Sequence, residues 1–176
     1  MNITGGKFNG RKITTVKSND VRPTSSKVRG SIFSMLISLG VNFSEITFLD
    51  LFAGSGIMGL EALSRGAKKA VFVEKNPQVF KLIKQNLANF DANFETFNMD
   101  ALSFMDKTAQ KFDIIFLDPP YREGFYEKVL GNLPNIMQED GYLVVEAPLE
   151  YQVPPSFSVL KHKVYGSTQV LVLQPS

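Results

Sequence analysis

Three glycines and one glutamate have a spacing typical of nucleotide-binding turns. Gly54, Gly56 and Gly59 form a G-x-G-x-x-G pattern between an apolar run and an amphipathic segment. Glycines at these positions permit a tight turn and let a ligand approach the backbone at the amino end of a helix. Glu74 follows the next apolar run, 20 residues after Gly54, where a carboxylate can accept hydrogen bonds from both hydroxyls of an adenosine ribose. The pattern predicts an adenosine-bearing ligand, which fits NAD and S-adenosylmethionine alike.

Two further carboxylates favour S-adenosylmethionine over NAD. Asp50 lies inside the first apolar run, just before the turn, where a buried charge is costly without a partner. A ligand with an ammonium and a sulfonium group would offset that cost, whereas a pyrophosphate would be repelled. Asp100 follows the third predicted strand and can either accept a hydrogen bond from an adenine amino group or cap a helix that begins at Ala101. The chain also leaves no room for the separate substrate domain of a dehydrogenase.

The segment Asp118-Pro119-Pro120-Tyr121 directly follows the most apolar predicted strand. Proline has a fixed φ and no N–H, so the two prolines make a rigid loop whose carbonyl and carboxylate acceptors suit an exocyclic amine. Two acceptors on an –NH2 group would orient its lone pair and stabilise the positive charge that develops as nitrogen attacks a methyl group. Tyr121 offers a face on which a base can stack. The alternative is a proline-rich turn whose carboxylate only caps a strand.

The elements that must position these residues alternate between strands and helices. Ser25 or Thr24 can cap a helix that ends at Gly40, and turn signals near Gly5 and Gly10 suggest a small hairpin before it. The alternation predicts an α/β, Rossmann-like fold with a mostly parallel seven-stranded sheet, in which only a closing C-terminal hairpin is antiparallel. The predicted strands are 46–52, 70–73, 94–97, 112–117, 142–145, 157–164 and 169–173. The predicted later helices are 57–64, 77–90, 101–107 and 123–137, the last broken by Pro134.

Composition narrows the class of protein. At roughly 150 residues per domain, 176 residues predict a single domain, with 1–40 as an N-terminal extension and 41–176 as the core. The chain has no cysteine and one histidine, which excludes a thiol nucleophile and most metal sites, so we expect no metal. No apolar run approaches 18 residues and residues 1–11 lack a signal-peptide core. We therefore expect a cytoplasmic, monomeric protein without a membrane span.

The net charge of +2 conceals an asymmetry along the chain. The first 35 residues hold seven basic residues and one acidic residue, while the remainder holds 12 basic and 16 acidic residues. A basic arm on an acidic body suggests a polyanionic partner such as nucleic acid. The other reading is a solvated surface segment, and charge alone does not separate the two.

Taken together, the chain resembles class I S-adenosylmethionine-dependent methyltransferases of amino groups, and in particular the RsmD family. That family comprises bacterial 16S ribosomal RNA guanine-N2 methyltransferases that modify guanine 966. The resemblance covers essentially the whole chain, including the arm. It rests on the segments Gly-Gly-Lys-Phe-Asn-Gly-Arg at 5–11, Arg-Pro-Thr at 22–24, Lys-Val-Arg at 27–29, Leu-Asp-Leu-Phe-Ala-Gly-Ser-Gly at 49–56 and Gly-Leu-Glu-Ala-Leu-Ser-Arg-Gly at 59–66.

The resemblance implies a role for each matching residue. It implies transfer from S-adenosylmethionine, which becomes S-adenosylhomocysteine, to 16S rRNA in the assembling small ribosomal subunit. One departure is Gly30, where the family usually has glutamate. Donor binding is implied for Asp50, Phe52, Ala53, Gly54, Ser55, Gly56, Gly59, Glu74, Lys75, Asp100, Ala101 and Asp118. Contact with the target amine is implied for Asp118, Pro119, Pro120 and Tyr121, and contact with RNA for Arg11, Arg22 and Arg29.

Three other functions stay open at this point. A DNA adenine-N6 methyltransferase fits Asp-Pro-Pro-Tyr equally well, although such enzymes usually need a target-recognition domain for which the chain has no room. A small NAD-binding oxidoreductase fits the glycines but not the Asp118 segment. A non-catalytic RNA-binding factor would not need the acidic residues around the donor site. Cytosine-C5 methylation is excluded because it requires a cysteine.

Overall fold

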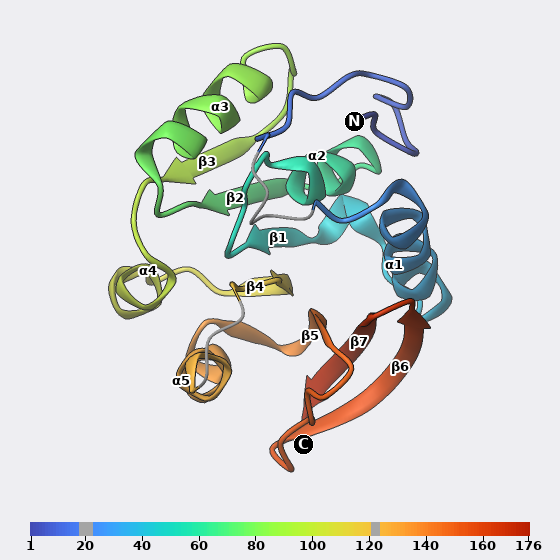
Figure 1. The fold of residues 1–176 in the computed structure, drawn as a ribbon, viewed down its shortest axis with the longest axis vertical. Coiled ribbons are helices and arrows are strands. Elements are labelled where there is room, and N and C mark those ends of the chain that lie inside the picture. The colour runs from blue at the N-terminus through green and yellow to red at the C-terminus, as the bar shows by residue number, and fades with distance from the viewer. Residues whose placement is uncertain (18–22, 121–123) are drawn as a thin grey trace.

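The chain folds around one seven-stranded sheet. The structure is a computed structural model, which describes residues 1–17, 23–120 and 124–176. The strand order is β3-β2-β1-β4-β5-β7-β6 (Figure 1), and only β7 runs against the other strands. The predicted α/β sheet with a closing hairpin is confirmed. The strands are β1 Thr47–Asp50, β2 Lys69–Val73, β3 Phe94–Phe97, β4 Phe112–Leu117, β5 Met137–Pro148, β6 Phe157–Tyr165 and β7 Thr168–Pro175.

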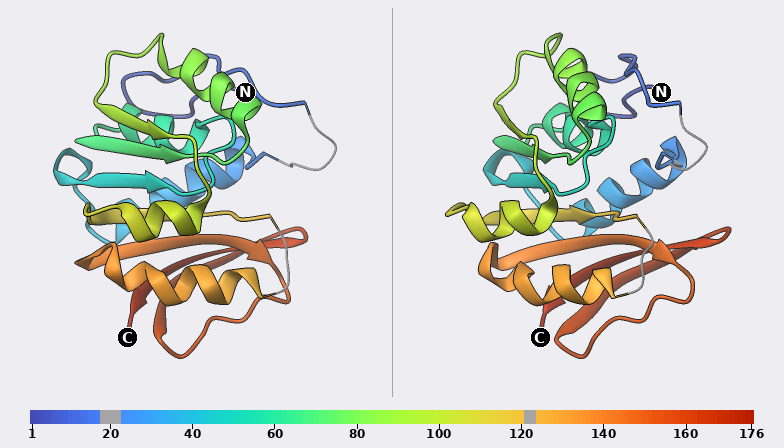
Figure 2. Two further views of the ribbon diagram at one scale, coloured as in Figure 1. Left: turned by 90° about the vertical axis from the view of Figure 1, so that its left-hand side faces the viewer. Right: turned by 60° about the vertical axis from the view of Figure 1, so that its left-hand side comes forward.

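Helices cover both faces of the sheet, as the two side views show (Figure 2). The helices α1, α2 and α3 share one hydrophobic cluster with one sheet face, and α4 and α5 share a second cluster with the other face. Successive strand residues point to opposite faces, so β1 sends Phe48 to the first cluster and Leu49 to the second. The helices are α1 Ser26–Ser38, α2 Ile57–Ser64, α3 Pro77–Leu87, α4 Ala101–Lys107 and α5 Phe125–Asn132.

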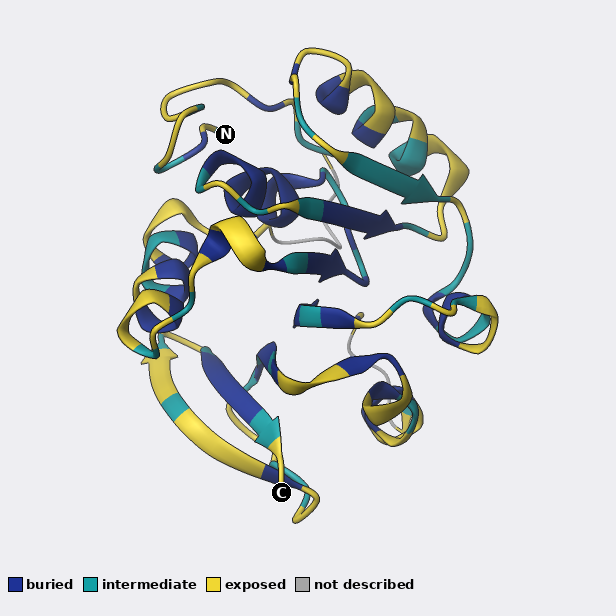
Figure 3. Cartoon of the chain, turned by 180° about the vertical axis from the view of Figure 1, so that it is seen from behind, coloured by how far each residue is buried: buried dark blue, intermediate teal, exposed yellow. Residues whose placement is uncertain are grey.

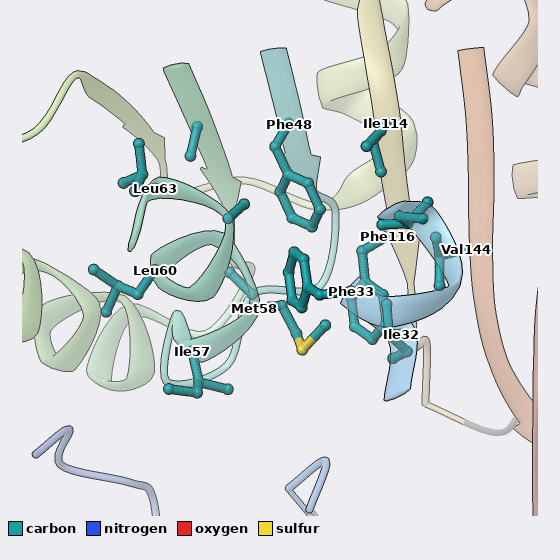
Figure 4. Packing of buried hydrophobic residues seen from close by; sticks show 14 of the residues in the cluster. Ile32, Phe33, Phe48, Ile57, Met58, Leu60, Leu63, Ile114, Phe116 and Val144 are labelled. Carbon is teal, nitrogen blue, oxygen red and sulfur yellow. The ribbon is translucent and has the colours of Figure 1, made fainter. Parts of the chain in front are cut away.

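Helix α1 packs as part of the core. Ser25 caps it as predicted by accepting a hydrogen bond from the Val28 amide at 3.3 Å. Figure 4 shows Phe33 of α1, Phe48 of β1 and Met58 of α2 meeting in the first cluster, and the two phenylalanine ring centroids lie 6.3 Å apart. The first cluster therefore joins α1 directly to the strand and helix that flank the glycine turn.

The N-terminal arm also belongs to this core. Ile3 and Ile13 are each only 1% exposed. The predicted hairpin is reduced to a single antiparallel bridge between Asn2 and Lys12. The segment between them bonds to α2 instead, since the Lys7 amide donates to the Ser64 carbonyl at 2.8 Å. Residues 1–17 therefore form a loop that is hydrogen-bonded to α2 and α3 rather than a separate hairpin.

The last predicted helix is too long. Residues 123–137 were expected to be helical, but α5 ends at Asn132 and a short 3-10 helix, Leu133–Asn135, follows it. Pro134 has no N–H to continue the helix, and the Ile136 carbonyl already accepts the Phe112 amide of β4. Met137 then pairs with Phe112, so β5 begins where helix was expected.

Burial is uneven across the sheet (Figure 3). The central strands β1, β2 and β4 are mostly buried, whereas β6 at the edge is mostly exposed. Within the described ranges, no helix is long and apolar enough to cross a membrane. The central strands β1, β2 and β4 thus end in the best-packed part of the molecule, and their carboxyl ends carry the candidate site.

Candidate active site

The glycine turn joins β1 to α2, and its three glycines do different work. Gly54 and Gly56 have φ of 55° and 84°, a conformation that disfavours other residues, and Gly56 is the N-cap of α2. A Cβ on Gly59 would lie 2.3 Å from the Phe72 ring, so Gly59 lets α2 pack closely on β2. The turn thus leaves the amino end of α2 at the carboxyl edge of the sheet.

Glu74 lies at the end of β2 and touches this turn. Its Oε2 accepts a hydrogen bond from the Gly54 amide at 2.9 Å, and its Oε1 accepts one from the Asn76 amide at 3.0 Å. The structure therefore brings together the glycine turn and the carboxylate that the sequence paired with it. Each oxygen keeps a second lone pair, so the carboxylate retains acceptor capacity for a ribose hydroxyl.

Asp50 is the most isolated charge in the site. It is 1% exposed, and neither carboxylate oxygen has a hydrogen-bond partner among the described residues. Burial, and next the charge of Glu74, raises the pKa of Asp50 to about 7. The amides of Gly59 and Phe52 lower the pKa in part, without meeting hydrogen-bond geometry. A buried carboxylate without a partner fits a site that receives a cationic group.

Asp118 lies beside Glu146, a carboxylate that the sequence motifs did not predict to be part of the site. Strands β4 and β5 pair Phe116 with Val144 and Leu117 with Val145, so Asp118 and Glu146 are the next residues of each strand. Because residues alternate between faces, both carboxylates fall on the sheet face that packs on α1 and α2. Burial, followed by the charges of Glu146 and Asp50, raises the pKa of Asp118 well above its usual value.

Glu146 is also held from the N-terminal side. The Thr24 hydroxyl donates a hydrogen bond to Glu146 Oε2 at 2.6 Å. Burial raises the pKa of Glu146, and the Thr24 hydrogen bond offsets part of that rise. One signal could have revealed Glu146 from the sequence, since it directly follows the predicted strand 142–145 in the same way as Asp118 follows the predicted strand 112–117. The three carboxylates belong to three adjacent strands: Asp50 is the last residue of β1, Asp118 directly follows β4, and Glu146 lies near the carboxyl end of β5.

Asp100 has the helix-capping role that was one of its two predicted readings. Its carboxylate accepts hydrogen bonds from the Ser103 amide at 2.9 Å and the Ser103 hydroxyl at 2.8 Å. These bonds are the main reason that the pKa of Asp100 is lowered, and Lys75 contributes weakly. Ala101 is buried in the second cluster. The cap leaves the ligand role of Asp100 a prediction.

The remaining turn residues surround the glycines. Ala53 is buried, and its amide donates to the Val73 carbonyl at 2.9 Å. The Ser55 carbonyl accepts the Asn86 side-chain amide at 2.9 Å. The Phe52 ring meets Phe125 edge-on, with centroids 5.6 Å apart. Lys75 is exposed next to Glu74. In the Asp118 loop, Pro119 is buried and Pro120 is exposed, while Tyr121 lies outside the described residues.

The prediction that Arg29 faces RNA is wrong. Its side chain is 1% exposed, and its Nε pairs with Glu61 Oε1 at 3.0 Å. Its other two nitrogens donate to the carbonyls of Thr24 at 2.6 Å and Asn2 at 2.8 Å. Arg29 therefore ties α1 to the arm and α2, and no phosphate can reach it. A residue type alone does not reveal such burial, because the partners lie far away in the sequence.

The structure also separates Arg11 from the carboxylates. Arg11 is exposed, lies over the rings of Phe8 and Phe90, and donates to the Asn89 carbonyl at 3.1 Å. Asn89 and Phe90 follow the carboxyl end of α3, and none of these Arg11 contacts involves Asp50, Glu74 or Asp118. Arg22 lies outside the described residues. A Cβ on Gly30, the departure from the family pattern, would meet nothing within 4 Å.

Metal ligands are not grouped in the described part of the chain. No set of three or more His, Cys, Asp or Glu side chains in those ranges could hold a metal ion. The donor set at the carboxyl edge consists of carboxylates, backbone amides and carbonyls. Such groups fit an organic ligand with hydroxyl, amino and cationic centres.

The fold defines a class of protein. Ribosomal protein L11 methylase from Lactobacillus delbrueckii subsp. bulgaricus has the same fold, with a TM-score of 0.68 over 88% of this chain and 80% of that chain at 17% identity. The Escherichia coli protein yhhF superposes with a TM-score of 0.86 at 33% identity, over 99% of this chain and 97% of that one. The architecture is that of class I methyltransferases.

The family follows from the sequence comparisons. A family model described as conserved hypothetical protein 95 matches residues 1–174. Ribosomal RNA small subunit methyltransferase D from Escherichia coli strain K12 is 34% identical over 98% of this chain and 88% of its own length. The Haemophilus influenzae protein of the same name is 33% identical over 93% and 88%. The chain belongs to this family, the RsmD family of methyltransferases.

Proposed function

We propose that this protein transfers a methyl group from S-adenosylmethionine to the exocyclic N2 amine of a guanine in 16S rRNA, within the assembling small ribosomal subunit. Guanine 966 is the position that the family resemblance suggests. The observation that carries the proposal is the isolated carboxylate of Asp50 on the same sheet face as Asp118. The relatives named as small-subunit rRNA methyltransferases support the RNA substrate.

On the donor side, the chain offers a complementary surface. The turn at 54–59 presents backbone to the donor, and Glu74 accepts hydrogen bonds from the ribose hydroxyls. Asp50 offsets the cationic charge of the methionyl part, and S-adenosylmethionine supplies a methyl group activated on a sulfonium. The adenine lies by Asp100 and Ala101 in this proposal. The other donor-site residues that we propose to line the pocket are Phe52, Ala53, Ser55, Lys75 and Asp118.

On the acceptor side, Asp118 and the Pro119 carbonyl hold the target amine. A carboxylate that accepts an N–H bond aligns the nitrogen lone pair with the methyl group and stabilises the positive charge that nitrogen develops. Pro120 keeps the loop rigid, and Tyr121 stacks on the base. Arg11 and Arg22 contact RNA phosphates in this proposal, and Arg29 does not.

The test uses methyl-labelled S-adenosylmethionine with unmodified small ribosomal subunits, free 16S rRNA and duplex DNA, followed by digestion to nucleosides. We expect N2-methylguanosine from the subunits. N6-methyladenine from DNA would overturn the proposed RNA substrate but keep the proposed role of Asp118 in holding the target amine. Donor binding without transfer to any substrate would favour a non-catalytic RNA-binding factor, and binding of NAD in place of the donor would favour an oxidoreductase.

A further inference from the structure

Glu146 has no role in the function proposed above, yet its position is unusual. It lies in β5, two residues before the end of the strand, and follows the residue that pairs with Leu117 of β4, on the sheet face where Asp50 is buried. We refer to Asp50, Asp118 and Glu146 as the carboxylate trio. A carboxylate there adds repulsion to a site that already contains two others, which makes it costly unless its charge is used.

The described groups that face the trio do not neutralise it. Thr24, which precedes α1, gives Glu146 one neutral hydrogen bond, and the Tyr126 hydroxyl of α5 donates to the Glu146 backbone carbonyl at 3.4 Å. Glu74 of β2 adds a further negative charge near Asp50. Arg29 of α1 is engaged with Glu61. Among the described residues, no ion pair reaches any member of the trio.

Like charges that share a desolvated site do not all stay ionised near neutral pH. The pKa of each member is raised, in every case chiefly by burial, and the charge of Glu146 is the second cause for Asp118. The isolated Asp50 oxygens independently point to a ligand that brings positive charge. Such a ligand would let the trio ionise.

We propose that Glu146 is a positioning residue that couples donor binding to proton release: the trio retains a proton before a donor binds, and loses it when a permanently charged sulfonium arrives. This inference rests on the proposed use of S-adenosylmethionine. Glu146 acts through Asp118, because its charge decides whether the neighbouring carboxylate holds the proton. Donor binding thereby converts Asp118 into the ionised acceptor that the target amine needs.

The coupling should differ between the donor and its product. S-adenosylhomocysteine lacks the sulfonium charge, so it compensates the trio less than the donor does. After transfer, the methylated nitrogen gives up one proton, and the trio takes up this proton or one from solvent. The site then binds the product less well than the donor at neutral and acidic pH. Sinefungin, which carries an ammonium group in the corresponding region, should behave like the donor.

The test counts protons rather than turnover. Isothermal titration calorimetry of S-adenosylmethionine binding at pH 6.5, in phosphate and in imidazole, gives the number of protons released from the dependence on buffer ionisation enthalpy. The variants are Glu146→Gln, Glu146→Asp as the conservative rescue, and Glu150→Gln as the control. Glu150 is exposed four residues further along the chain, so its variant makes the same charge change outside the trio.

We expect the wild type and Glu150→Gln to release up to one proton for each donor molecule bound. Their affinity for S-adenosylmethionine should fall by up to roughly tenfold for each pH unit below neutrality. Glu146→Gln should lose at least half of this release and show a flatter affinity profile, which Glu146→Asp restores. Because the ligand's amino group can also exchange protons, the difference between wild type and Glu146→Gln is the quantity that decides.

Two outcomes overturn the inference by itself. One is equal proton release in wild type and Glu146→Gln, and the other is equal release for S-adenosylmethionine and S-adenosylhomocysteine in the wild type. If Glu146→Gln fails to fold, Glu146→Asp and the comparison of donor with product still decide. A wild-type protein that does not bind S-adenosylmethionine at all would instead overturn the proposed function.

Discussion

Within the residues that the structure describes, two regions bury acidic side chains: one pairs the carboxylate with cations and the other leaves it without a partner. Where the arm meets α2, Glu61 is fully buried and its carboxylate is saturated by Arg29, Arg65 and the amide and hydroxyl of Thr4. At the carboxyl edge of the sheet, Asp50 is equally buried and has no hydrogen-bond partner among the described residues. A buried charge with partners holds the fold together, while one without partners indicates a ligand.

The largest expected effect is a loss of folding stability in the variant Arg29→Met, which tests the paired region around Glu61. The variant removes a positive partner of Glu61 and leaves the carbonyls of Thr24 and Asn2 without their donors. Breaking a buried pair typically costs about 3–5 kcal/mol, and urea unfolding followed by circular dichroism measures the loss. A loss below about 1 kcal/mol would show that the Glu61 region is not the structural anchor that its contacts indicate.

Asp118→Asn should affect the reaction and spare the fold. We expect methyl transfer to fall by roughly 10²–10³-fold, as when a preorganised electrostatic group is removed from an active site, while donor affinity changes by a few-fold at most. Labelled-methyl turnover and calorimetric donor binding measure the two effects. Turnover equal to wild type would remove Asp118 from the site.

Asp50→Asn should alter the dependence of stability on pH. A raised pKa means that the folded state holds this proton more tightly than the unfolded state, so the stabilisation from protonated Asp50 is lost as pH rises from about 3.8 to about 7. We expect the unfolding free energy of the wild type, relative to the variant, to fall by up to about 1.4 kcal/mol per pH unit in that window.

Urea unfolding of both proteins between pH 4.5 and 8, without donor, measures this difference. Glu150→Gln serves as a control for a change of surface charge. A pH-independent difference between wild type and Asp50→Asn would mean that Asp50 titrates normally despite its burial. The same variant should bind S-adenosylmethionine at least several-fold more weakly at pH 8, where wild-type Asp50 is ionised.

The smallest effect is expected for Arg11→Ala. Arg11 is exposed and lies 5.0 and 5.1 Å from the ring centroids of Phe8 and Phe90, a contact worth about 0.5–1 kcal/mol at an exposed site. If Arg11 also contacts one phosphate, the log–log salt dependence of RNA binding should fall by roughly one unit. Filter binding at several salt concentrations measures that slope, and an unchanged slope would leave Arg11 with a structural role alone.

Much of the fold was predictable because the turn and cap residues agree with the alternation of strands and helices along the chain. The helix at 57–64 and the strands at 94–97 and 112–117 match the structure residue for residue. The helix predicted over 123–137 is too long because the Ile136 carbonyl accepts a hydrogen bond from the Phe112 amide of β4 and is not available to a helix. That hydrogen bond joins residues 24 positions apart, so local helix propensity could not predict it.

The sequence by itself determined the residues that follow each central strand: the glycine turn, Asp50, Glu74 and Asp118 lie at one sheet edge because parallel strands end on the same side. Only the tertiary structure decided which charges are paired. Arg29 is buried because Glu61 and the arm enclose it, and Glu146 joins the site because β5 pairs with β4, where its one side-chain hydrogen-bond partner among the described residues is Thr24, 122 residues away. Pairing and desolvation depend on neighbours distant in the chain, so residue type and spacing could not predict them.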